Sequence, residues 1–154
     1  MIMENCSKGS FLENKIEIRH REIRNEKKLK SFAKQILEGI KEIHDAGIIH
    51  ADLKLANVLM HRRTPEQKSQ GKFHVLKIAD FGIARRVDEN GKCEMKVRSG
   101  TAGYIAPEIK GNNTIIDRSV DMWAYGVMLY EMAAGYKPTQ FRNYKYESGP
   151  IPFR

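Results

Sequence analysis

Four short motifs occur in this chain in one order, and together they constrain its fold more than any other feature. They are His50-Ala51-Asp52-Leu53-Lys54-Leu55-Ala56-Asn57, then Asp80-Phe81-Gly82, then Ala106-Pro107-Glu108, and finally Asp121-Met122-Trp123-Ala124-Tyr125-Gly126. The first motif fits the pattern H-x-D-L-K-x-x-N at all five fixed positions, which random sequence does roughly once in several million starting points. The other three are weak alone, but their order after the first makes a coincidence negligible.

These motifs resemble those of the protein kinase family, in the order in which that family carries them. Phosphoryl transfer needs an acceptor hydroxyl held in line and compensation of the charge on the phosphates. By the resemblance, Asp52 orients the hydroxyl and accepts its proton, and Lys54 neutralises the phosphate in transfer. Asn57 and Asp80 offer the hard oxygen ligands that suit magnesium. The resemblance therefore implies ATP and Mg²⁺ as cofactors, with catalytic Asp52 and Lys54 and metal ligands Asn57 and Asp80.

A second resemblance concerns the hydroxyl group that accepts the phosphoryl group. Lys54, together with residues 99–108 (SGTAGYIAPE), is similar to serine/threonine kinases rather than tyrosine kinases. It implies that Thr101 is a third catalytic residue, hydrogen-bonded near Asp52 and Lys54. Residues 102–106 would line the site for protein substrates that present a serine or threonine hydroxyl.

The same resemblance assigns a nucleotide site near the N-terminus. Met3 would be the gatekeeper of a hinge whose Glu4 and Cys6 backbone faces adenine. Ser10 falls where the ribose is usually contacted, and Leu59 would lie beneath the adenine ring. Support for the catalytic loop is expected from His50, Phe81 and Asp121.

Hydrophobic periodicity predicts two helices. Apolar residues recur every three or four positions over 26–45, which gives one broad apolar stripe, and Gly47 supplies a left-handed end. Residues 114–136 return to helical spacing and are apolar on most faces, so this helix should be central and buried.

Between the helices the sequence predicts short strands and loops. Residues 48–49 form a short buried strand, and residues 58–61 pair with 73–79 in a hairpin with a long connection. Residues 85–113 show little periodicity and are predicted to be a long functional loop. The fold class is mainly α with short β-hairpins, and the resemblance makes it a protein-kinase-like fold.

The resemblance covers residues 1–154 as a partial kinase domain. Its expected parts are the hinge at 1–10, helix E at 26–46, the catalytic loop at 50–57, the activation segment at 80–108 and helix F at 114–136. We expect a partial C-terminal lobe, without the N-terminal lobe and the last helices, and a fragment rather than a standalone lobe. Such a fragment should bind ATP weakly and be inactive alone. The usual partner of Glu108 would also be missing.

The chain departs from the family at two positions. Ala51 replaces the arginine that commonly precedes the catalytic aspartate and pairs with a phosphorylated residue of the activation segment. Four residues before Thr101, where a primary phosphosite is often found, the chain has Val97. We therefore expect a catalytic loop of the non-RD type, whose activity is not switched on by phosphorylation at that position.

Three other functions fit the sequence less well. A pseudokinase or scaffold lobe would have no chemical need for four intact catalytic and metal-binding positions, and a small-molecule phosphotransferase would lack residues 101–108. Nucleic-acid binding has only the net charge of +8 behind it, because the basic residues are scattered among acidic ones. No signal peptide or membrane-spanning segment is visible. We expect an intracellular, cytoplasmic protein, with a nuclear location left open.

Overall fold

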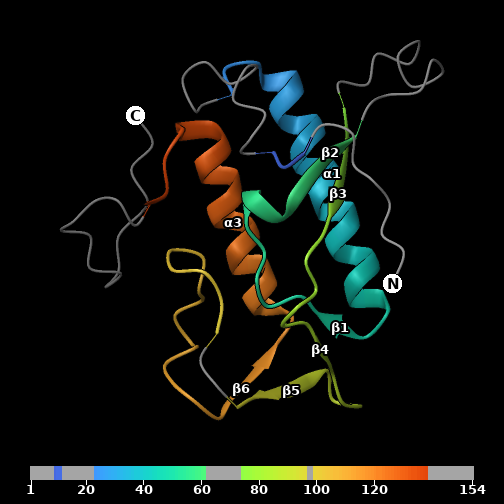
Figure 1. Cartoon of the computed structure of the whole chain (residues 1–154), viewed down its shortest axis with the longest axis vertical. Coiled ribbons are helices and arrows are strands. Elements are labelled where there is room, and N and C mark those ends of the chain that lie inside the picture. The colour runs from blue at the N-terminus through green and yellow to red at the C-terminus, as the bar shows by residue number, and fades with distance from the viewer. Residues whose placement is uncertain (1–8, 12–22, 62–73, 97–98, 139–154) are drawn as a thin grey trace.

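The computed structural model describes residues 9–11, 23–61, 74–96 and 99–138, and Figure 1 shows their arrangement. In chain order the elements are α1 (Glu26–Asp45), β1 (Ile48–Ile49), the 3-10 turn η1 (Leu55–Asn57), β2 (Val58–His61), β3 (Val75–Ile78), β4 (Arg85–Arg86), β5 (Lys92–Met95), β6 (Thr114–Asp117) and α3 (Ser119–Ala134). The strands form three two-stranded antiparallel sheets, β1–β4, β2–β3 and β5–β6. The predicted class, mainly α with short β-hairpins, is confirmed.

The helix α1 follows its predicted bounds. Asn25 caps its start, because the side-chain oxygen accepts a hydrogen bond of 3.0 Å from the Lys28 amide. Gly47 follows the helix end with a φ of 70°, the left-handed conformation that glycine adopts without strain. One face, with Phe32, Ile36 and Ile40, is buried.

The helix α3 is central and buried as expected, but it is shorter than 114–136. It begins at Ser119, because residues 114–117 form β6, and it ends at Gly135 with a φ of 81°. In β6 the side chains alternate between the two faces, so that Ile116 is 2% exposed and Ile115 is 60% exposed.

The long loop predicted for 85–113 is also partly wrong, since it contains two strands. β4 pairs with β1 through Ile48–Arg86 and Ile49–Arg85. β5 pairs with β6 over four residues each. Both pairings join segments that are distant in sequence, which local periodicity does not reveal. The predicted hairpin is confirmed as β2 with β3, in a register that sets Val58 opposite Ile78 and His61 opposite Val75.

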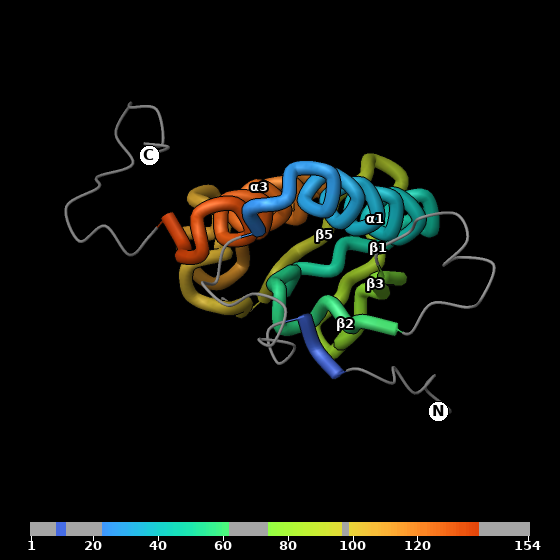
Figure 2. Tube along the Cα trace, turned by 90° about the horizontal axis from the view of Figure 1, so that it is seen from above, coloured from blue at the N-terminus to red at the C-terminus, as the bar shows by residue number. Residues whose placement is uncertain are grey.

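Two apolar clusters hold these elements together. The larger lies between α1, α3 and β2, and Tyr125 of α3 also donates a 3.0 Å hydrogen bond to the Ala33 carbonyl of α1. Figure 2 shows the two helices in one layer with the β2–β3 hairpin on one side of it. We call the smaller one the β5–β6 cluster; its buried members are Ile49, Met95, Ala106, Ile109, Ile116 and Val120. In the described ranges neither helix is long and apolar enough to cross a membrane.

Candidate active site

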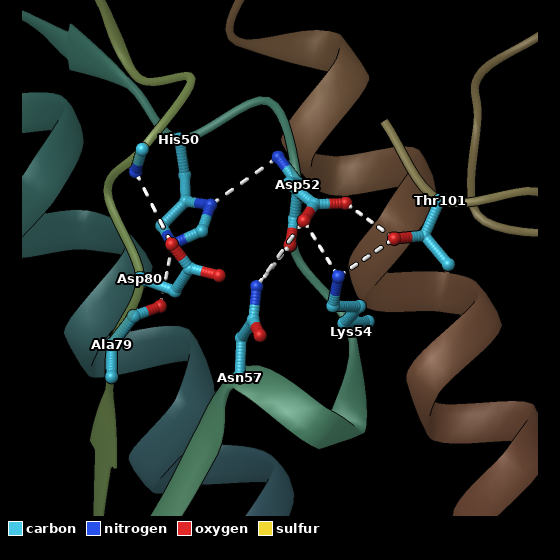
Figure 3. Close-up of polar contacts among 8 residues, drawn as sticks. His50, Asp52, Lys54, Asn57, Ala79, Asp80 and Thr101 are labelled. Carbon is cyan, nitrogen blue, oxygen red and sulfur yellow. Dashed lines mark hydrogen bonds and ion pairs between the residues drawn. The ribbon is translucent and has the colours of Figure 1, made fainter. Parts of the chain in front are cut away.

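Three predicted catalytic residues meet where the loop after β1 faces the segment before α3 (Figure 3). Lys54 Nζ lies 2.7 Å from Asp52 Oδ2 and donates a 2.8 Å hydrogen bond to Thr101 Oγ1. The Thr101 hydroxyl in turn donates a 2.7 Å hydrogen bond to Asp52 Oδ1. The three side chains thus form a closed triangle, as the resemblance implied. The Asp52 side chain in it is 15% exposed, and that of Lys54 is 21% exposed.

This triangle sets the charge state of Asp52. Partial burial raises the pKa of the carboxyl, but the hydrogen bonds from Lys54 and Thr101, the Lys54 charge and a bond from Asn57 together outweigh it. The pKa of Asp52 therefore lies below its usual range, and the group is ionised at neutral pH. An ionised carboxylate accepts hydrogen bonds with both oxygens, which suits the positioning of a substrate hydroxyl.

Asn57 is oriented by the same carboxylate. Its amide nitrogen donates to the Asp52 carbonyl at 3.0 Å and to Asp52 Oδ2 at 3.4 Å. The side-chain oxygen is left out of both bonds, although the residue is only 7% exposed. An amide nitrogen committed to Asp52 leaves Asn57 with the oxygen that a hard cation requires.

Asp80 follows β3 in a left-handed conformation, with a φ of 66°. Its Oδ1 accepts a 3.4 Å hydrogen bond from the Gly82 amide, and the residue is exposed. Figure 3 places Asp80 and Asn57 on the side of Asp52 away from Thr101. The described residues contain no cluster of three or more His, Cys, Asp or Glu that could hold a metal ion alone. The Asn57 amide oxygen and the Asp80 carboxylate are hard oxygen ligands of the kind that Mg²⁺ binds while it keeps its other positions for phosphate and water.

A buried carboxylate in α3 holds the start of the catalytic loop. Asp121 accepts hydrogen bonds of 2.9 Å from the backbone amides of His50 and Ala51. His44, in the last turn of α1, contacts the same carboxylate at 2.8 Å from Nε2. The sequence did not indicate a role for His44, because a single histidine in a helix gives no signal of its partner.

The His50 ring is fixed at both nitrogens. Nδ1 accepts a 3.3 Å hydrogen bond from the Asp52 amide, so Nε2 carries the proton and donates to the Ala79 carbonyl at 3.0 Å. The Phe81 ring lies beside it, with 4.9 Å between the centroids. These are the stacked and hydrogen-bonded contacts expected for His50, Phe81 and Asp121.

The segment around Thr101 approaches the catalytic loop closely. Gly100 has a φ of 112°, and a Cβ added there would lie 3.3 Å from the Ala51 carbonyl oxygen. Ala51 itself has a φ of 64°, an uncommon conformation for a residue with a Cβ. Both the left-handed backbone and the tight approach to the Ala51 carbonyl therefore favour glycine at position 100.

Tyr104 attaches the segment to α3. Its buried hydroxyl donates a short hydrogen bond to Glu131, and its amide donates to the Thr101 carbonyl at 3.0 Å. Burial and the neighbouring Glu131 carboxylate raise the pKa of Tyr104 well above its usual value. The hydroxyl therefore stays protonated and available as a donor.

Glu108 at the end of the segment is not without a partner. Ser119 Oγ donates a 3.2 Å hydrogen bond to Glu108 Oε1, and the expectation that the family's usual partner of Glu108 is missing stays a prediction. Both residues are exposed, so this contact stabilises little.

The structure reaches only part of the predicted nucleotide site. Ser10 and Leu59 lie side by side in an antiparallel bridge, which is flanked by hydrogen bonds from Phe11 to Val58 and from Met60 to Gly9. The other candidates, Met3, Glu4 and Cys6, lie outside the described residues.

Comparison with known proteins identifies the family. A model of the protein kinase domain matches residues 1–149. The probable serine/threonine-protein kinase fhkE of Dictyostelium discoideum is 35% identical over 81% of this chain, which corresponds to 18% of that protein. The calcium/calmodulin-dependent protein kinase cmkB of Emericella nidulans is 36% identical over 86% of the chain and 28% of its own length. The serine/threonine-protein kinase polo of Drosophila melanogaster is 34% identical over 94% of the chain and 23% of its own length.

The chain thus spans less than a third of the length of each of these relatives. The family model nevertheless covers nearly all of it, including the catalytic loop, the Asp80-Phe81-Gly82 turn and α3. The chain belongs to the eukaryotic-type serine/threonine protein kinase family.

Proposed function

We propose that this chain carries the phosphoryl-transfer residues of a protein kinase that acts on serine and threonine hydroxyls of protein substrates. The observation that carries the proposal is the closed triangle of Asp52, Lys54 and Thr101. Family membership supports protein phosphorylation in general, and the names of the relatives support the choice of serine and threonine.

Asp52 is the group that receives the substrate. Thr101 donates to its Oδ1, and Lys54 and Asn57 donate to its Oδ2, which fixes the direction of the remaining lone pairs. A serine or threonine hydroxyl donates to one of these lone pairs, and its oxygen then attacks the γ-phosphorus of ATP. The bond from that phosphorus to the bridging oxygen breaks, ADP leaves, and the hydroxyl proton passes to Asp52.

Lys54 is the compensating charge. Its ammonium bridges Asp52 and Thr101, so it is fixed within hydrogen-bond distance of the carboxylate that receives the hydroxyl. A positive charge held there stabilises the negative charge that develops on the transferred group, and it does so without reorganisation during the reaction.

Asn57 and Asp80 would hold magnesium through the Asn57 amide oxygen and the Asp80 carboxylate. When bound, Mg²⁺ supplies positive charge to the phosphates of ATP. The chain's own contribution is to orient these ligands, since Asp52 fixes the Asn57 amide and the Gly82 amide contacts Asp80.

The proposal includes a nucleotide site. The bridge between Ser10 and Leu59 supports a site that both residues share. The roles of Met3, Glu4 and Cys6, the weak ATP binding of residues 1–154 alone, and the cytoplasmic location stay predictions of the sequence.

A non-RD catalytic loop is also part of the proposal. Ala51 uses its backbone amide on Asp121, but its methyl side chain cannot pair with a phosphate. Phosphorylation four residues before Thr101 is chemically impossible at Val97.

The test uses the full-length protein that contains this chain, labelled ATP and a mixed peptide library. Asp52→Asn should lower transfer more than about a hundredfold, because a positioned base contributes on that order. Asp45→Asn is the matched control, since Asp45 is exposed and pairs with Lys41 at the end of α1. Equal rates for Asp52→Asn and the wild type would refute the role of Asp52. Absence of transfer by the wild type would instead favour a pseudokinase or scaffold.

A further inference from the structure

Residues 99–108 are held in place although position 51, directly before Asp52, carries no charge that could bind a phosphate. Ala51 offers no cation, and Val97 offers no phosphate. Thr101 nevertheless lies within hydrogen-bond distance of Asp52 and Lys54. Contacts other than a pair between an arginine and a phosphate must therefore hold residues 99–108 in place.

The β5–β6 sheet is the structure that joins this segment to the rest of the domain. Its register pairs Lys92 with Asp117 at one end and Met95 with Thr114 at the other. One further hydrogen bond, from the Asn113 amide to the Lys96 carbonyl at 3.2 Å, extends the pairing beyond Met95. The sheet thus ties the first half of the activation segment to the residues that precede α3.

The apolar side of this sheet belongs to a cluster that includes three residues next to the catalytic machinery or to its supports. Met95 and Ile116, both 2% exposed, pack in the β5–β6 cluster defined above. The same cluster contains Ile49, which precedes His50, and Val120, which precedes Asp121. It also contains Ala106, at the far end of the activation segment. One buried cluster therefore contacts the catalytic loop, the support for that loop and both halves of the activation segment.

The β5–β6 cluster lies close to the activation segment where that segment returns to the active site. Ile105 packs against the β5–β6 cluster, and its Cγ1 is 3.4 Å from where a Cβ on Gly100 would lie. Gly100 in turn lies against the Ala51 backbone. Displacement of Met95 would therefore be transmitted through neighbouring side chains to Thr101.

We propose that Met95 and Ile116 are positioning residues, and that the β5–β6 pair holds the activation segment in its active arrangement without phosphorylation. This inference rests on the proposed function, since the arrangement matters only if the triangle transfers phosphate. The β5–β6 pair would explain how a kinase that lacks the catalytic-loop arginine keeps residues 102–106 arranged for a peptide substrate.

The first test compares buried methionines in the two clusters, in full-length protein treated with phosphatase. Met95→Ala removes the side chain from the β5–β6 cluster, and Met128→Ala removes one that is 0% exposed from the larger cluster. We expect Met95→Ala to raise the peptide KM about tenfold with little change in the KM for ATP. Met128→Ala should lower the melting temperature with an unchanged peptide KM, and Met95→Leu should restore the wild-type value. Equal peptide KM values for the two alanine variants would overturn the proposal.

The second test needs no variant, so it stands even if Met95→Ala does not fold. Hydrogen exchange of phosphatase-treated wild-type protein should show protected amides in β5 and β6, because paired strands exchange slowly. Exchange of β5 at the rate of an unstructured peptide would overturn the proposal. So would wild-type activity that disappears on phosphatase treatment, although the proposed function would then still stand. A wild type inactive in every preparation, with β5 protected, would refute the proposed function and with it the positioning role.

Discussion

The Thr101 hydroxyl donates a 2.7 Å hydrogen bond to Asp52 Oδ1 across 49 residues of sequence. The same hydroxyl accepts a hydrogen bond from Lys54, so it uses its proton and a lone pair within one triangle. Its removal leaves both charged groups with one contact fewer in a partly buried site. Thr101 therefore couples the activation segment to the two catalytic charges.

Thr101→Val tests this coupling, because valine keeps the shape of threonine and lacks the hydroxyl. We expect kcat to fall about 10- to 100-fold, which corresponds to about 1.4–2.8 kcal/mol of transition-state stabilisation. Thr101→Ser should retain most of the rate, since the hydroxyl remains. Steady-state kinetics with a peptide substrate measure both, and equal losses in the two variants would contradict a specific role of the hydroxyl.

The pKa of Asp52 predicts a definite dependence on pH. Because the pKa lies below its usual range, protonation of Asp52 does not reduce the rate until the pH falls below the ordinary aspartate value of about 3.9. The contribution of Asp52 to stability depends on pH in the same direction. A depressed pKa contributes stability that is present above the unfolded value and lost as the pH falls through the folded value.

Lys54→Met should move this titration to higher pH. The lysine supplies a hydrogen bond and a positive charge that lower the pKa, and without them only the hydrogen bonds from Thr101 and Asn57 oppose the burial that raises it. Carbon NMR of the labelled carboxyl groups can follow the titration in both proteins. An Asp52 resonance that titrates at the same pH in wild type and variant would contradict the prediction.

The sequence predicted which residues lie together in the site better than it predicted the strands around them. Asp52, Lys54 and Asn57 lie within one short loop, so their proximity follows from local geometry once the loop is identified. Thr101 was placed by resemblance alone, because no local signal connects it to Asp52. The roles assigned to these residues stay predictions that the kinetic experiments decide.

The errors have one physical cause. The strands β4, β5 and β6 were missed because their partners are distant in sequence, and β6 was merged with α3 because Ile115 and Ile116 continue the apolar pattern of the helix. Pairing with β5 determines the strand, and tertiary contacts of this kind override local preference. The bounds of α1 were predicted well because its cap, stripe and terminal glycine are all local.

Tyr104→Phe should destabilise the protein more than Tyr125→Phe does. Tyr104 donates to the Glu131 carboxylate, whereas Tyr125 donates to the neutral Ala33 carbonyl at 3.0 Å. Hydrogen bonds to charged groups contribute about 1.5–3 kcal/mol and neutral ones about 0.5–1.5 kcal/mol. Urea unfolding at neutral pH measures both losses. A larger loss for Tyr125→Phe would contradict this ordering.

Asp80→Asn should raise the magnesium concentration needed for half-maximal transfer. The substitution keeps the size of the side chain and removes the negative charge that an exposed carboxylate offers to the cation. Titration of the rate with Mg²⁺ at fixed ATP gives the midpoint. Asp117→Asn is a useful control, because Asp117 is exposed at the end of β6 and its carboxylate accepts a hydrogen bond from Ser119. An unchanged midpoint for Asp80→Asn would remove Asp80 from the metal site.

Cys93 provides a chemical probe of the β5–β6 sheet. It lies in β5 opposite Ile116 and is a free cysteine. Burial raises the pKa of its thiol, so little thiolate is present at neutral pH and alkylation should be slow. Opening of the sheet would expose the thiol and lower its pKa, and both changes accelerate the reaction.

We expect iodoacetamide to label Cys93 about tenfold faster in Met95→Ala than in wild type, since the reaction proceeds through the open state. A Cys6→Ser background leaves Cys93 as the only cysteine within residues 1–154. Met128→Ala again serves as control, because it weakens the larger cluster and leaves the β5–β6 cluster intact. Equal acceleration in both variants would indicate global unfolding rather than opening of β5, and the rate measured by mass spectrometry of the labelled peptide separates the two cases.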